Sequence, residues 1–287
     1  MERPIRNYST KKGYNLEYTV IGYGEPVLVM HGGHSSCMEE LGYRELVERG
    51  YSVITPSRPG YGGTSAELGK NISYACEAYV ELLDEWSVDQ IHVIAISAGG
   101  PSGIHLASQY PNRIKSLTLQ SAVARRWLTP RDPKYTITKL MFRPSNEKYV
   151  WALMRLMNNH FPRQLLASMI PSFSTWPTDK VLQHLNDEAR RQFQEMMKRQ
   201  RSGHGFLIDL DQAQQDLSSA LSAVPCPVLI LHSVHDAAVP VEHARYANQH
   251  LPNAQLCELE SWGHLIWLGP DAADMYRKLF HFLEISS

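Results

Sequence analysis

Short runs rich in valine and isoleucine recur along the chain, with helical patterns between them. A run that is apolar at almost every position is typical of a strand buried on both faces, as in a parallel sheet covered by helices. The alternation therefore predicts an α/β fold with a mostly parallel sheet and helices on both faces. The predicted strands are residues 14–21, 26–30, 51–55, a run that starts at residue 91, 114–119, 227–232 and 255–259. The predicted helices outside the region 122–224 are residues 38–49, 73–86, 100–109, 241–250 and a last helix from about residue 270.

The alternation of strands and helices stops after residue 121 and resumes at residue 227. Between these points there are helical patterns, including residues 148–158 and 180–198, separated by prolines, but no convincing strand. A long helical block between two strands of one sheet is typical of a cap, or lid, over one edge of the sheet. We therefore predict an α/β core of residues 1–121 and 225–287 and a helical cap, or lid, of residues 122–224. Such a cap is expected above the carboxyl ends of the strands, where open α/β sheets bind ligands.

The stretch of residues 91–103 runs from a strand through a sharp turn into a helix, and Ser97 stands in the turn. The order small residue, any residue, Ser, any residue, Gly is typical of a nucleophile elbow, whose strained turn lifts the serine hydroxyl above the sheet edge. The two positions that must be small are Ala95 and Gly99, and Ala95 departs mildly from the usual glycine. Because the pattern is short, the assignment of Ser97 as a nucleophile depends on the rest of the chain.

A base and an acid follow Ser97 in the order that this architecture requires. A serine hydroxyl needs a base within hydrogen-bond distance and a third group that orients the base. Asp236 comes directly after the strand at 227–232, and His264 comes after the strand at 255–259, so both leave the sheet at the edge where Ser97 lies. The segment after the strand at 114–119 holds no carboxylate that competes with Asp236. We therefore predict a catalytic triad of Ser97, Asp236 and His264.

A glycine-rich loop, His31-Gly32-Gly33-His34, follows the strand at 26–30. Acyl transfer passes through a tetrahedral oxyanion, which two main-chain N–H groups can stabilise. We predict that these donors are the N–H groups of Gly33 and of Ala98, the residue after the nucleophile. His31 is expected to be a structural hydrogen-bonding residue of the loop.

These motifs together resemble the α/β-hydrolase fold family, and the resemblance covers nearly the whole chain. The matching segments are HGG at 31–33, SRPGYGGTS at 57–65, AISAG at 95–99, VHDAAVP at 234–240 and WGH at 262–264. The resemblance implies an eight-stranded, mostly parallel sheet with a helical cap, in the branch of serine esterases and lactonases. It also implies the roles given above to Ser97, Asp236, His264, Gly33 and Ala98.

The sequence departs from some members of that family at defined positions. Ser57 stands where many members have Asp, which we interpret as a structural substitution. His34 and Ser35 stand where proline iminopeptidases have Pro-Gly, which argues against aminopeptidase activity. The nucleophile is a serine, which argues against the haloalkane dehalogenase and epoxide hydrolase branches, because those form an ester on Asp.

Other side chains are candidates for binding or for alternative chemistry. A metal site formed by His232, His235, Asp236 and His243 is not favoured, because a strand points His232 and His235 in different directions. Cys37, near the glycine-rich loop, lacks a local histidine partner for nucleophilic chemistry and is expected to be a small buried residue. Candidate substrate-binding residues in the loops and the cap are His34, Trp127, Trp151, Met154 and Trp262.

The composition limits which binding partners and which cellular compartment we expect. The formal net charge of −1 gives no electrostatic reason to expect nucleic acid or an anionic membrane as a partner. Neither a signal peptide nor a membrane-spanning run is evident, and the four cysteines form no CxxC pair. We therefore expect a cytoplasmic protein with reduced thiols that acts on a small molecule, and the sequence carries no signal for its oligomeric state.

The sequence thus predicts a serine hydrolase that needs no cofactor. Its expected substrate is a small or medium, largely apolar carboxylic ester or lactone, which passes through an acyl-enzyme on Ser97. Two alternatives use the same residues, namely hydrolysis of a C–C bond and perhydrolysis. A third alternative is a ligand receptor with little turnover, which the intact triad disfavours.

Overall fold

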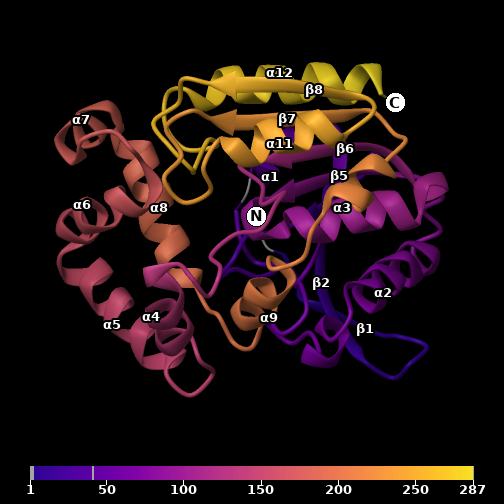
Figure 1. The fold of residues 1–287 in the computed structure, drawn as a ribbon, viewed down its shortest axis with the longest axis horizontal. Helices are drawn as coiled ribbons and strands as arrows, with labels where there is room; N and C mark the ends of the chain where they lie inside the picture. Colours follow the sequence, from indigo (N-terminus) through magenta and orange to yellow (C-terminus); the bar gives the residue numbers. More distant parts are fainter. Residues whose placement is uncertain (1–2, 41, 287) are drawn as a thin grey trace.

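A computed structural model of the protein describes residues 3–40 and 42–286. Eight strands form one sheet in the order β1-β2-β4-β3-β5-β6-β7-β8 (Figure 1). β2 pairs antiparallel with β1 and with β4, and all the other neighbours are parallel. The predicted α/β fold with a mostly parallel, eight-stranded sheet is therefore confirmed. The strands are β1 (Arg6–Ser9), β2 (Asn15–Ile21), β3 (Glu25–Met30), β4 (Tyr51–Pro56), β5 (Ile91–Ile96), β6 (Ile114–Gln120), β7 (Val228–Ser233) and β8 (Ala254–Leu259).

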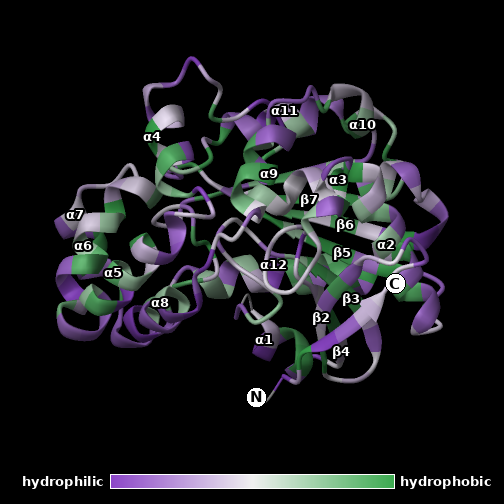
Figure 2. Ribbon diagram, turned by 90° about the horizontal axis from the view of Figure 1, so that it is seen from below, coloured by the Kyte–Doolittle hydropathy of each residue, from purple (hydrophilic) through white to green (hydrophobic). Residues whose placement is uncertain are grey.

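Helices cover both faces of the sheet because alternate residues of each strand point to opposite faces. In β5, Val93 and Ala95 join one buried apolar cluster, and Ile94 and Ile96 join another. The first cluster contains residues of α2, α3, α10 and α11, and the second contains residues of α1 and α12. Figure 2 shows the hydrophobic residues, in green, along the strands between these layers. The helices of the two layers are α1 (Tyr43–Glu48), α2 (Ile72–Glu85), α3 (Gly100–Gln109), α10 (Ser218–Ser222), α11 (Glu242–His250) and α12 (Ala272–Ile285).

Between β6 and β7 the described chain contains helices but no strand. Five of these helices gather at one end of the molecule, at the left of Figure 1. The other two lie against the core, because α9 (Gly205–Gln212) packs on the short helix η1 (Ala66–Gly69) and α10 packs on α3 and α11. The five gathered helices are α4 (Pro133–Met141), α5 (Glu147–His160), α6 (Pro162–Phe173), α7 (Thr178–His184) and α8 (Asp187–Arg199).

Three details of the fold differ from the sequence prediction. β1 was not predicted, because its residues RNYS are polar and mostly exposed and pair only with β2. The helix predicted at 38–49 is shorter and forms only over Tyr43–Glu48. The single helix predicted at 180–198 is two helices, because Asn186 caps α8 by accepting a hydrogen bond from the N–H of Ala189 at 2.9 Å. Residues 1, 2, 41 and 287 of the predicted core lie outside the described residues.

Within the described residues, no helix is both long and apolar enough to cross a membrane.

Candidate active site

Ser97 occupies a strained turn at the carboxyl end of β5. Its φ is +52°, in the left-handed region that a residue with a side chain rarely adopts. The turn lies so close to the neighbouring strand that a Cβ atom at Gly99 would be 2.5 Å from the carbonyl oxygen of Met30. The main chain thus holds Ser97 in a single strained conformation at the start of α3.

Three loops bring Ser97, His264 and Asp236 together in one hydrogen-bonded chain. His264 Nε2 is 2.9 Å from Ser97 Oγ, and His264 Nδ1 is 2.7 Å from Asp236 Oδ2. Asp236 and His264 are buried, whereas Ser97 is half-buried. This arrangement allows the imidazole to take a proton from the serine hydroxyl while the carboxylate stabilises the resulting imidazolium.

The carboxylate of Asp236 is held as an anion. Its Oδ1 accepts hydrogen bonds from the N–H groups of Ala238 and Val239, each at 2.8 Å. Burial alone would raise the pKa of Asp236, but the charge of His264 and the hydrogen bonds from His232 and His264 outweigh burial. The pKa of Asp236 therefore lies well below its ordinary value.

The glycine-rich loop at 31–34 lies beside the serine. A Cβ atom at Gly32 would be 3.3 Å from the Cβ of Ser97, and one at Gly33 would be 3.7 Å from the Cβ of Ala98. Within the described chain, the N–H of Gly33 makes no hydrogen bond. The N–H of Ala98 lies in the first turn of a helix, where main-chain donors have no partner within the helix. Both donors predicted for the oxyanion are thus next to Ser97.

Arg58 fixes the peptide groups of this loop. Its Nε donates to the carbonyl oxygen of His31 at 2.7 Å, and its Nη2 donates to that of Gly32 at 3.1 Å. His31 Nε2 accepts the N–H of Arg58 at 2.9 Å, and burial beside Arg58 holds the pKa of His31 well below its ordinary value. Arg58 also forms a buried ion pair with Asp209 of α9, which accepts a further hydrogen bond from the hydroxyl of Tyr61 at 2.6 Å. His31 therefore has the structural role that was predicted for it, and α9 is tied to the loop.

His34 sits among aromatic rings next to the glycines. Its ring stacks on Phe206 at 4.1 Å between centroids and lies 4.2 Å from the ring of Phe142 and 5.2 Å from that of Trp151. The ring of Phe206 would also be 3.6 Å from a Cβ atom at Gly33. The rings of His34, Phe142, Trp151 and Phe206 thus form an aromatic wall directly beside the predicted oxyanion donors.

The protonation of His34 follows from its partners. Ser202 Oγ is 2.8 Å from Trp151 Nε1, which can only donate, and 2.8 Å from His34 Nδ1. The serine hydroxyl can accept from Trp151 Nε1 and donate to His34 Nδ1 at the same time, and this arrangement puts the proton of the neutral ring on Nε2. Burial lowers the pKa of His34 to about 3, so the ring is neutral near pH 7. His34 Nε2 makes no hydrogen bond to the described residues and is not one of the fully buried polar atoms without a partner, so this N–H is free to donate.

The other predicted substrate-binding residues, Trp127, Met154 and Trp262, do not belong to the group of rings around His34. Trp127 is half-buried, and its Nε1 donates to the carbonyl oxygen of Ala238 at 3.0 Å, in the loop that follows Asp236. Met154 is half-buried and packs against the apolar cluster on the α12 side of the sheet. Trp262 is fully buried, and its Nε1 donates to the carbonyl oxygen of Leu268 at 2.8 Å, so it offers no surface to a substrate. Sequence analysis missed Phe142, Ser202 and Phe206, for which the sequence holds no local motif.

The end of α6 lies between the loop that carries Asp236 and the loop that carries His264. The carbonyl oxygen of Phe173 accepts the N–H of His264 at 2.8 Å and that of Ala237 at 3.3 Å. Ser174 forms an antiparallel bridge with Asp236, and its hydroxyl donates to the carbonyl oxygen of Trp262. A residue of the inserted helical segment thus supports both loops of the candidate site.

No group of three His, Cys, Asp or Glu side chains in the described part of the chain is arranged to hold a metal ion. His235 lies 3.3 Å from Glu260, away from the buried His232.

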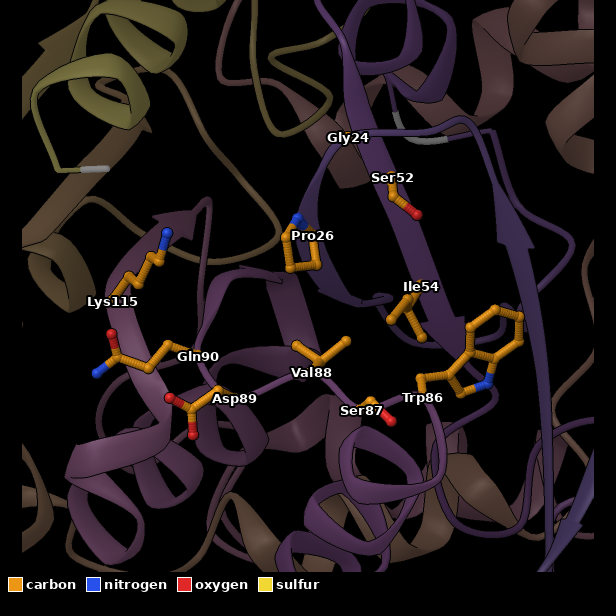
Figure 3. A pocket seen from close by; sticks show the side chains of 10 residues that line it. All are labelled: Gly24, Pro26, Ser52, Ile54, Trp86, Ser87, Val88, Asp89, Gln90 and Lys115. Carbon is orange, nitrogen blue, oxygen red and sulfur yellow. The ribbon is translucent and has the colours of Figure 1, made fainter.

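A pocket of 510 Å³ lies at the opposite edge of the sheet (Figure 3). It is lined by the amino-terminal ends of β3, β4 and β6 and by the turn before β5, whereas Ser97, Asp236 and His264 follow the carboxyl ends of β5, β7 and β8. This pocket is therefore separate from the candidate active site.

The fold and the site together define a hydrolase of the α/β type. The chain belongs to the α/β-hydrolase fold family, whose sequence model matches residues 25–269, and the resemblance inferred from the motifs is confirmed.

Three known proteins illustrate the similarity. The chain is 53% identical to the uncharacterized hydrolase YcgS of Bacillus subtilis, over 96% of this chain and 97% of that one. It is 23% identical to a 2-hydroxy-6-oxo-6-phenylhexa-2,4-dienoate hydrolase of Burkholderia cepacia, over 93% of this chain and 90% of that one. The solved structure of an alpha/beta hydrolase fold protein from Nakamurella multipartita superposes with a TM-score of 0.83 and 26% identity, covering 99% of this chain and 100% of that one.

Proposed function

We propose that this hydrolase cleaves a small or medium, largely apolar carboxylic ester or lactone through an acyl-enzyme on Ser97. The observation that carries the proposal is the hydrogen-bonded chain from Ser97 Oγ through His264 to Asp236, at 2.9 and 2.7 Å. The unpaired N–H of Gly33 beside Ala98 supports it, since an ester carbonyl needs such donors when it becomes an oxyanion.

The proposed reaction has two halves, formation of the acyl-enzyme and its hydrolysis, and each of these groups acts in both. Ser97 Oγ attacks the carbonyl carbon while its proton passes to His264 Nε2, and Asp236 stabilises the imidazolium. The N–H groups of Gly33 and Ala98 stabilise the oxyanion, by about 3–4 kcal/mol per donor in enzymes of this kind. His264 then gives its proton to the leaving alcohol and takes one from a water molecule, which attacks the acyl-enzyme and releases the acid.

The surroundings of His34 support an apolar substrate with a neutral hydrogen-bond acceptor. Phe142, Trp151 and Phe206 provide aromatic surface, and the free Nε2–H of a neutral His34 is a suitable donor to an ester or lactone oxygen. We therefore propose His34 and Trp151 as substrate contacts.

Hydrolysis of a C–C bond is the second candidate, because the Burkholderia cepacia relative is a dienoate hydrolase. A dienoate carries a carboxylate, which needs a cation or several donors when it is buried. The buried arginines of the described chain are already paired, Arg58 with Asp209 and Arg3 with Glu40. The ester or lactone is therefore favoured over the dienoate.

Product analysis with a substrate panel tests the proposal. The panel contains p-nitrophenyl esters of increasing chain length, a lactone and a β-diketone-like substrate for C–C cleavage, and the matched variants are Ser97→Ala and Ser108→Ala. Ester or lactone turnover that disappears in the first variant and persists in the second supports the proposal, because Ser108 is a half-buried serine of α3 outside the site. Turnover of the C–C substrate alone, or full ester turnover in Ser97→Ala, contradicts it.

A further inference from the structure

A second imidazole contacts the carboxylate of Asp236. His232 lies in β7, four residues before Asp236, and its Nε2 is 3.3 Å from Asp236 Oδ2. The same Nε2 is 2.7 Å from the carbonyl oxygen of Val239. The side chain of His232 is 1% exposed and that of Asp236 is 0% exposed, so water does not screen this contact. Asp236 Oδ2 is therefore shared between His264 and His232.

The contacts of His232 determine where its proton lies. A carbonyl oxygen can only accept, so His232 Nε2 carries the hydrogen and donates it to Val239, with Asp236 Oδ2 3.3 Å from the same nitrogen. His232 Nδ1 is buried and has no hydrogen-bond partner among the described residues. A proton on Nδ1 would add a buried donor without an acceptor, which is costly. His232 thus presents one N–H, on Nε2, to the Asp236 side.

We propose that His232 is a positioning residue that sets how strongly Asp236 stabilises the protonated form of His264. The proposal rests on the proposed function, in which His264 is the base for Ser97. The N–H of His232 holds Asp236 Oδ2 in place and draws negative charge from it, at the oxygen that also binds His264 Nδ1. Without that N–H, the full charge of Oδ2 faces His264, and His264 keeps its proton to higher pH.

Other ionisable groups near this pair have partners of their own. His243 of α11 accepts the N–H groups of Ala124 and Arg125 on its Nδ1, and Glu258 of β8 pairs with Arg245 at 2.7 Å. The Arg125 side chain is exposed and lies over the ring of Tyr246, and His235 lies against Glu260. None of these groups hydrogen-bonds the side chain of Asp236 in the described chain. The effect of replacing His232 is therefore expected to act through Oδ2.

The test compares two substitutions of His232 that differ in one donor. His232→Gln places an amide N–H near the position of Nε2, and His232→Leu fills similar space without a donor. His243→Asn is the control, since it changes a neighbouring buried histidine that hydrogen-bonds to Ala124 and Arg125 and makes no hydrogen bond to Asp236 among the described residues. For each variant, the pH dependence of kcat/KM is measured with a p-nitrophenyl ester, together with the pH dependence of the rate at which a fluorophosphonate labels Ser97. In that labelling Ser97 Oγ bonds to phosphorus, fluoride leaves, and the serine proton passes to His264.

We expect His232→Leu to lower kcat and the labelling rate about tenfold, because Asp236 Oδ2 is no longer held in place against His264, with KM unchanged. The acid limb of both pH profiles should move to higher pH in His232→Leu and stay in place in His232→Gln and His243→Asn. A purely structural role would lower the melting temperature but leave the acid limb unmoved.

Wild-type profiles in a folded His232→Leu enzyme, or equal shifts in the Leu and Gln variants, would overturn the proposal. If the leucine variant does not fold, His232→Asn replaces it, because its shorter amide ends near the position of Nδ1 and lacks the donor to Asp236. Labelling at Ser97 without any ester turnover refutes the ester proposal yet still tests His232 through the labelling rate. An unlabelled wild-type protein refutes both proposals.

Discussion

Gly103 of α3 lies directly against Ala95 of β5, and a Cβ atom at Gly103 would be 2.5 Å from the Cβ of Ala95. Nucleophile elbows usually have glycine at the position of Ala95. In this protein the missing side chain is on the helix, so the strand can carry a methyl group two residues before Ser97. The two positions together leave the space that the elbow requires.

Gly103→Ala is therefore expected to destabilise the protein by about 1–3 kcal/mol, the usual cost of overpacking a core. The double variant Ala95→Gly, Gly103→Ala should regain most of that loss, because it moves the methyl group from the strand to the helix. The wild type, the two single variants and the double variant form a double-mutant cycle. Urea unfolding of these four proteins measures the coupling free energy between the two positions. Additive effects of the two substitutions would show that the two positions do not share this space.

Asp236→Asn should leave the fold intact and lower kcat by about 10³–10⁴-fold, with a much smaller change in KM. An amide cannot stabilise the imidazolium of His264, and it favours the wrong tautomer of the neutral ring. Steady-state kinetics with an ester measures the effect. Asp211→Asn, at an exposed position of α9, is the control and should retain wild-type kcat. A loss of less than tenfold in Asp236→Asn would argue against its assignment as the acid.

Ser202→Ala tests whether the aromatic wall binds substrate. The substitution removes the hydrogen bonds at 2.8 Å to His34 Nδ1 and Trp151 Nε1 without touching Ser97. We expect KM to rise about fivefold, the value of one hydrogen bond, while kcat changes little. Ser168→Ala, at an exposed position of α6, should leave KM unchanged. A fall in kcat with constant KM would place Ser202 with the reacting groups instead.

Two histidines whose pKa values are lowered in the folded protein, His34 and His243, should make the protein sensitive to acid. Burial is the main cause that lowers the pKa of His34 and of His243 to about 3. Each ring has an ordinary pKa of 6.5, so the unfolded chain binds protons more readily than the folded one. The free energy of unfolding should therefore fall as the pH decreases from about 6.5 toward about 3.

His243→Asn should reduce this loss by about 1–3 kcal/mol between pH 7 and pH 4. The asparagine amide oxygen can still accept the N–H groups that now bond to His243 Nδ1, those of Ala124 and Arg125. Urea unfolding at both pH values measures the difference. His250→Asn, on the same helix and half-buried, should show the wild-type loss. An unchanged loss in His243→Asn would show that this ring is not a source of the sensitivity.

The sheet was predictable because its signal is local. Strands such as β5 are apolar on both faces, with Val93 and Ala95 facing one helical layer and Ile94 and Ile96 the other. β1 lacks that signal, since it is a short edge strand with mostly exposed residues. The break between α7 and α8 had a local signal in Asn186 followed by acidic residues, which is typical of a helix start.

The placement of Ser97, Asp236 and His264 was predictable for a topological reason. Parallel strands end at the same edge of the sheet, so residues that follow β5, β7 and β8 must lie near one another. Their surroundings were not predictable, because Ser202 and Phe206 reach His34 from segments about 170 residues away in the chain. The contact of His232 with Asp236 depends on how the two side chains are oriented at the end of β7. Hydrophobic periodicity in the sequence predicts strands and helices, but it does not predict such an orientation.

The carbonyl oxygen of Phe173 accepts N–H groups from both the loop of His264 and the loop of Asp236. Gly263 permits this approach, because a Cβ atom there would be 2.4 Å from that oxygen. The inserted segment thus supports the loops of Asp236 and His264, in addition to forming part of the proposed substrate site. If this segment is exchanged between homologous enzymes, in evolution or by engineering, the position of the carbonyl group at the end of α6 must be preserved. The glycine opposite it, Gly263, must be preserved as well. Under the proposed function, substrate preference can diversify through α4 and α5, while the position of the Phe173 carbonyl group is constrained by its hydrogen bonds to His264 and Ala237.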